Sequence, residues 1–159
     1  MDKHARRLFL FSFASFCLVL AFGTVRATGP LREFFDRPAS LKSLQDFHAH
    51  FDALCWLGSA ALGAALWVWR EKWRGPAFVP AAFTLCWMVG SLLFAASFLA
   101  KGLGEALGLS WMARGLYAAL ASVGGTLFFP VIGLGGWMAL SAARADGPGH
   151  PRERRPGPG

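Results

Sequence analysis

The chain has 159 residues, of which 55% are hydrophobic and 16% are charged. A soluble domain carries about 25% charged residues, so this composition excludes an ordinary soluble protein and indicates an integral membrane protein. The net charge of +7 does not indicate nucleic-acid binding, because the basic residues lie at the ends of apolar runs and in the C-terminal tail. We therefore expect the lipid bilayer as the partner, and no nucleic acid.

The first apolar run covers residues 8–25 and follows a short basic start, DKHARR. It is longer than the apolar core of a signal peptide, which has about 7–15 residues, so we interpret it as a retained membrane span. His4 lies among the basic residues before it and is expected to be exposed to solvent. The connection that follows, residues 26–44, is hydrophilic and contains Pro30 and Pro38.

The second span covers residues 48–69, and its helix is expected to begin near Leu44, because Ser43 and Asp46 fit a variant of the capping box. The third span covers residues 78–100. It is followed by a Gly-rich segment, residues 101–110, that we interpret as a loop.

The fourth span covers residues 112–140 and contains Pro130 near its middle. Proline removes one helical hydrogen bond and clashes with the preceding turn, so a kink is expected there. Ala118, Ser122 and Thr126 recur every four residues, and we expect this small-residue stripe to pack closely on another helix.

These elements predict an all-α membrane protein: a four-transmembrane-helix bundle, residues 1–142, with a longer first loop on the outer side. The remaining residues, 143–159, are rich in Pro, Gly and Arg and are expected to form a disordered basic tail. Ten of the sixteen Lys and Arg residues lie on the side of the N-terminus. The positive-inside rule then places both termini in the cytoplasm, and the bacterial inner membrane is the expected location.

The candidate site lies where the second span begins, at His48, His50 and Asp52. Ionisable groups within a span are costly and are functional-site candidates by default. Because a helix turns about 100° per residue, Asp52 shares a face with His48 and could accept its ring N–H, whereas His50 points nearly the opposite way. The face of His50 is otherwise small and apolar, which suits a flat macrocycle held by one nitrogen atom, as in haem.

Residues 49–67, AHFDALCWLGSAALGAALW, resemble the second helix of small four-helix membrane isomerases, the styrene oxide isomerases and hydroxylaminobenzene mutases. The segment HAHF is also similar to short proteins related to haem-copper oxidase subunit I. The isomerase resemblance implies haem b, with His50 as the axial metal ligand and a ferric iron acting as a Lewis acid. His48, two residues away, is a further candidate for cofactor binding. The family's polar residues on the third helix are not found here, and Tyr117 on the fourth span is the sole tyrosine.

Three functions remain open from the sequence. The first is an isomerase or mutase that uses haem b on a small hydrophobic substrate containing oxygen, with Asp52, His48 and Tyr117 as catalytic residues. The second is a non-catalytic haem or electron-transfer protein, and the third is a cofactor-free accessory membrane protein. Four short spans enclose little volume, so a homo-oligomer is expected in each case. Cys17, Cys55 and Cys86 lie inside apolar runs and are interpreted as small buried hydrophobic residues.

Overall fold

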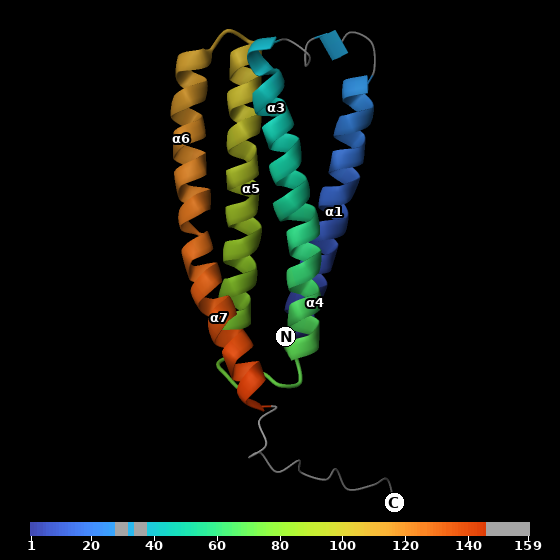
Figure 1. Ribbon diagram of the computed structural model, residues 1–159, viewed down its shortest axis with the longest axis vertical. Coiled ribbons are helices and arrows are strands. Elements are labelled where there is room, and N and C mark those ends of the chain that lie inside the picture. The colour runs from blue at the N-terminus through green and yellow to red at the C-terminus, as the bar shows by residue number, and fades with distance from the viewer. Residues whose placement is uncertain (28–31, 34–37, 146–159) are drawn as a thin grey trace, which may run out of the picture.

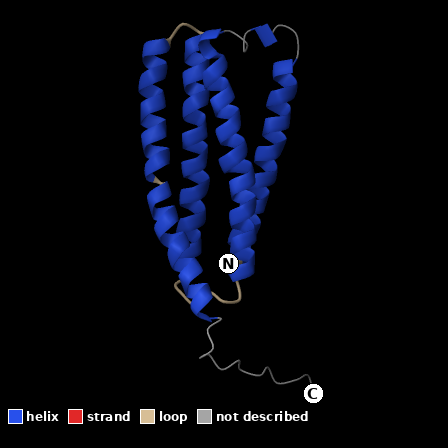
Figure 2. Cartoon of the chain, viewed as in Figure 1, coloured by secondary structure: helices blue, strands red, loops and turns tan. Residues whose placement is uncertain are grey.

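The computed structural model describes residues 1–27, 32–33 and 38–145, and these residues fold entirely into helices and short connections (Figures 1 and 2). The helices are α1 (Asp2–Ala27), α3 (Pro38–His50), the π-helix η1 (Phe51–Gly58), α4 (Ser59–Trp69), α5 (Phe78–Ala106), α6 (Ser110–Thr126) and α7 (Phe128–Ala145). No strand occurs among the described residues.

Four segments are long and apolar enough to cross a membrane: Asp2–Val25, Leu41–Trp69, Phe78–Ala106 and Trp111–Ala145. The second segment runs through α3, η1 and α4, and the fourth through α6 and α7. The start of α1 and the end of α7 lie at the same end of the bundle, the lower end in Figure 1. The predicted all-helical class and the four apolar spans are confirmed.

Helix α5 lies at the centre of the bundle and packs against α3, α6 and α7, while α1 packs mainly on α4 and η1. Towards the upper end, α1 leans away from α3 (Figure 1). The main buried cluster lies in the lower half and joins residues of four spans: Ala5, Leu8, Leu66, Val79, Phe83, Val131 and Met138. A smaller cluster of Phe51, Cys55 and Ala95 lies further up.

His4 belongs to the buried side of α1, so its predicted exposure is wrong. Its side chain is only 3% exposed, next to the buried Ala5. Ala5 and Leu8 are four and seven residues from Met1 along the helix and lie on the same stripe, which faces the core. The basic neighbours Lys3 and Arg6 are exposed instead. The burial of His4 could not be predicted from the apolar run, because the helix begins at Asp2, six residues before that run starts.

The helix of the second span begins earlier than predicted, at Pro38 instead of near Leu44. Proline fits the first turn of a helix, where its missing N–H would have no helical partner. The expected capping box does not form, because the Ser43 hydroxyl donates to Glu105 Oε2 on α5, at 2.9 Å. Ser43 therefore joins two helices at the upper end of the bundle.

Helix α5 continues past residue 100 to Ala106, so the expected loop over residues 101–110 is wrong for its first half. Gly102 lies inside the helix, where the Leu44 side chain packs against it. A Cβ at this position would lie only 2.8 Å from the Leu44 side chain, so glycine fits there. The helix ends in a Schellman motif, in which Gly108 has φ 76° and Leu109 N donates to the oxygen of Gly104 at 2.7 Å.

The fourth span is broken, as Pro130 predicts. Helix α6 ends at Thr126 and α7 begins at Phe128, which places Pro130 in the first turn of α7. The Thr126 hydroxyl donates to the oxygen of Ser122 at 2.7 Å. The stripe of Ala118, Ser122 and Thr126 is exposed, so its predicted packing within the chain is wrong.

The face of α6 that meets α5 is set by Gly124 instead. A Cβ on Gly124 would lie 2.6 Å from the nitrogen of Phe94 and 2.9 Å from the oxygen of Gly90. Two glycines therefore let the backbones of α5 and α6 approach closely, the arrangement that small residues permit in apolar bundles. The outer sides of α6 and α7 carry large exposed apolar residues, among them Trp111, Phe129 and Ile132.

Candidate functional site

His48 and Asp52 form an ion-pair contact on the second span. His48 Nε2 lies 3.3 Å from Asp52 Oδ2, and the side chains are 42% and 27% exposed. The spacing of four residues places them one above the other on the helix, as the sequence predicts. The pair is held on a helix instead of a loop, so its geometry is fixed by the backbone.

His48 lines an apolar cavity of about 280 Å³. We call it the upper cavity, and it lies between α1, α3, η1 and α5. Its lining comes from three spans: Leu18, Val19 and Phe22 from α1; Phe47, His48 and Phe51 from the second span; Leu92, Ala96 and Leu99 from α5. The ring of Phe47 contacts Phe22 at 5.5 Å and Phe51 at 5.4 Å, so one side of the wall is aromatic.

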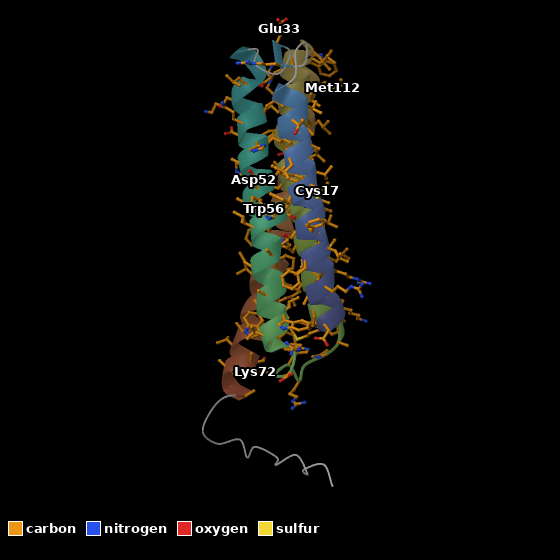
Figure 3. The ribbon with its side chains drawn as sticks, turned by 90° about the vertical axis from the view of Figure 1, so that its right-hand side faces the viewer. Cys17, Glu33, Asp52, Trp56, Lys72 and Met112 are labelled. Atoms are coloured by element: carbon orange, nitrogen blue, oxygen red, sulfur yellow. The ribbon has the colours of Figure 1, made fainter. Side chains whose placement is uncertain are left out.

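The second carboxylate oxygen of Asp52 is buried without a hydrogen-bond partner among the described residues. A buried acceptor left without a donor costs about 1–3 kcal/mol. Such groups are rare in native structures and can mark a site with a chemical role. Figure 3 shows Asp52 on the second span beside α1, at the height of Cys17.

His50 lies on the opposite side of the helix, in an aromatic cluster on α5. Its ring stacks on Phe98 with centroids 4.4 Å apart and planes 12° from parallel, and Phe94 meets its edge at 5.4 Å. Its Nδ1 is 2.7 Å from the oxygen of Asp46. A carbonyl oxygen only accepts, so Nδ1 carries the proton and Nε2 carries the lone pair.

Tyr117 joins the His50 side of the bundle and lies away from His48. Its ring meets Phe98 edge-on at 5.3 Å, and Lys101 Nζ lies 5.4 Å from its centroid. Of the predicted site residues, the structure therefore brings together His48 and Asp52 at one place, and His50 and Tyr117 at another. No local sequence pattern indicates Lys101 as a neighbour of Tyr117, because the contact joins α5 to α6.

The π-helix η1 begins immediately after His50 and contains Asp52. π-Helical turns are rare and often occur at functional sites. Side chains from two other helices bind η1 or the residue that follows it: Ser12 Oγ donates to the oxygen of Trp56 at 2.9 Å, and Trp87 Nε1 donates to Oγ of Ser59, the first residue of α4, at 2.8 Å.

Ser59 also donates to the oxygen of Leu54, five residues back, at 3.3 Å. The widened turn is therefore tied to α1 and α5 by hydroxyl and indole groups. No sequence pattern indicates this π-helix.

The donor groups in the structure set limits on metal binding. Among the described residues, no group of three or more His, Cys, Asp and Glu side chains could hold a metal ion. Cys55 is buried and Cys17 is exposed, so the expected burial of the cysteines holds for Cys55 and fails for Cys17. Free cysteines on different helices do not form a ligand set here. A histidine acting alone, as His50 would, is suited only to a metal that brings its other ligands with it.

The chain was compared with protein-family models, with curated proteins and with solved structures, and no match was found in any of the three. The resemblance to the small membrane isomerases therefore stays a prediction, and a function for this chain depends on the geometry of its own residues.

Proposed function

We propose that this chain is an integral membrane protein that binds a small hydrophobic molecule containing oxygen in the upper cavity and isomerises it. The observation that supports this proposal is that His48, with Asp52 beside it, lines an otherwise apolar cavity. An apolar cavity of about 150 Å³ can hold benzene. A volume of about 280 Å³ has room for a substituted single ring.

In this proposal His48 is the general acid and base, and Asp52 orients its ring. Protonated His48 donates to the substrate oxygen as a C–O bond breaks, and neutral His48 recovers a proton from the rearranged product. An isomerisation therefore needs no second substrate. Proton transfer by a positioned side chain contributes about 10²–10⁴-fold to a rate.

A fluorinated epoxide, 4-fluorostyrene oxide, tests binding and turnover with one probe. We expect saturable broadening of its fluorine NMR signal by the detergent-solubilised chain, and formation of the aldehyde detected by gas chromatography. Ala96→Leu fills the cavity and should abolish both, whereas Ala118→Leu adds the same side chain to the exposed side of α6 and should change neither. Equal signals from the two variants would refute the cavity as the binding site.

His48→Gln separates catalysis from binding. It should leave the broadening and lower the turnover by about 10²-fold or more, because the acid is removed while the cavity remains. Asp52→Asn should lower the turnover by about 10-fold or more, the effect expected for a residue that orients another. Turnover at the wild-type rate in both variants would exclude the pair from the chemistry.

A second candidate function is haem b binding through His50, and a specific contact favours it. Metal-ligating histidines usually donate their other ring N–H to a carbonyl or carboxylate, and Nδ1 of His50 donates to the oxygen of Asp46 at 2.7 Å. The donor set also fits, since haem needs only an axial ligand from the protein. When bound, haem b would supply a ferric iron that acts as a Lewis acid on a substrate oxygen.

Under this candidate, His50 would hold the iron, and Lys101 would offer a cation to the carboxylates of haem. Since His50 and Tyr117 lie away from the upper cavity, a second copy of the chain would have to cover the cofactor. The test is haem titration of the purified chain in detergent. A Soret band that disappears in His50→Ala and stays in His48→Ala is expected, and the absence of a band in the wild-type protein would exclude the candidate.

A further inference from the structure

A second groove lies at the lower end of the bundle, between the first turns of α1 and the last turns of α4. Its volume is about 560 Å³. Apolar side chains line it, together with one cation: Arg6, Phe9 and Leu10 from α1; Ala64, Trp67 and Val68 from α4. Leu10, Trp67 and Val68 are each about half exposed or more. The groove is therefore an open apolar channel with a guanidinium group at one end.

Three cations on α1 beside this groove have no ion-pair or hydrogen-bond partner within the described part of the chain. The side chains of Lys3, Arg6 and Arg7 are exposed and make no ion pair or hydrogen bond there. Arg70, at the same end, differs: its Nε lies 3.6 Å from Asp2 Oδ1, and its NH1 donates to the oxygen of Trp67 at 2.8 Å. Three positive charges on the first two turns of α1 thus lack a counter-charge.

The chemistry of the groove selects among possible occupants. A second copy of the chain docking symmetrically would bring the same three cations against themselves, because the same patch serves both partners in such a contact. A free phosphate would neutralise Arg6 but leave the apolar walls uncovered. A phospholipid neutralises the cations with its phosphate and covers the apolar walls with its acyl chain, which would lie along Phe9, Leu10 and Val68. The start of α1 is also the positive end of its helix dipole, which favours an anion.

We propose that this groove is a binding site for an anionic phospholipid, whose headgroup is held by Arg6 with Lys3 and Arg7 nearby and whose acyl chain lies between α1 and α4. Basic pockets between membrane helices are known to bind anionic headgroups. The indole of Trp67 lies under the guanidinium of Arg70, at 4.0 Å. This stacking helps to fix the wall of the groove opposite α1.

Native mass spectrometry of the full chain in detergent tests the proposal with two short-chain lipids, dioctanoylphosphatidylglycerol and dioctanoylphosphatidylcholine. The anionic lipid should bind about tenfold more tightly or better, because each nearby Lys or Arg contributes about 1 kcal/mol to binding an anionic lipid. Equal affinity for the two lipids would overturn the proposal.

Two variants give the matched comparison. Arg6→Gln should weaken phosphatidylglycerol binding about fivefold, while Arg74→Gln, an exposed arginine at the same end but outside the groove, should not. Ala64→Leu narrows the channel and should weaken both lipids, which tests the acyl chain. Inorganic phosphate at millimolar concentration should not displace the lipid. Displacement by phosphate, or equal effects of the two arginine variants, would exclude a lipid site here.

Discussion

The contact between α5 and α6 predicts opposite effects on stability for alanine substitutions at two neighbouring glycines. A Cβ on Gly124 would lie 2.6 Å from the nitrogen of Phe94 and 2.9 Å from the oxygen of Gly90, and both are backbone atoms that cannot rotate away. Gly124→Ala therefore forces the helices apart. Overpacking of this kind costs about 1–3 kcal/mol. Alanine regains about 1 kcal/mol of helix propensity, so we expect a net loss of up to about 2 kcal/mol in the free energy of unfolding.

Gly125→Ala is the control, because a Cβ there meets no atom within 4 Å. Only the propensity term remains, so we expect this variant to gain about 0.5–1 kcal/mol. The measurement is unfolding in mixed micelles with increasing SDS, followed by far-UV circular dichroism. If both variants shift the free energy of unfolding equally, or if Gly124→Ala stabilises the chain, then α5 and α6 do not meet at these glycines.

Two further predictions concern polar contacts between helices. Ser59→Ala and Trp87→Phe each remove the hydrogen bond of 2.8 Å between these residues, so a double-mutant cycle should give a coupling of about 0.6–1.7 kcal/mol in unfolding free energy; additive effects would exclude the bond. Ser43→Ala removes the contact with Glu105 at the upper end and should lower the unfolding free energy by about 1 kcal/mol; the effect should vanish when Glu105 is already replaced by alanine.

The number and order of the spans could be predicted, because an apolar run long enough to cross a bilayer is visible without knowing its neighbours. The ends of the helices could not. Pro38 and Gly102 read as helix breakers in isolation, yet one opens α3 and the other lies within α5. The reason is tertiary: Gly102 is needed where Leu44 packs against the helix. The buried face of α6 likewise depends on a neighbouring helix, because Gly124 of α6 packs on Gly90 of α5.

Part of the candidate site also follows from local spacing. His48 and Asp52 are four residues apart, and helical geometry alone brings them together, as the contact of 3.3 Å confirms. The upper cavity could not be predicted, because its walls come from three spans that are far apart in the sequence. Tyr117 is a candidate from the sequence because it is the sole tyrosine and could supply a hydroxyl group from the fourth span to a site with His48 and Asp52. The structure separates them, since Tyr117 packs on the Phe98 side of α5.

The π-helix η1 lies between the lower core of the bundle and His48, and it contains Asp52, the partner of His48. A π-helix bonds residues five apart, whereas an α-helix bonds residues four apart, so η1 absorbs extra residues without extending the helix in proportion. Each residue regained by an α-helix would turn the upper part of the span by about 100° relative to α4. His48 would then leave the wall of the upper cavity. The hydroxyl of Ser59, bound to Leu54 and Trp87, and that of Ser12, bound to Trp56, hold η1 in its present form. The direction of His48 therefore depends on serines that the cavity never contacts.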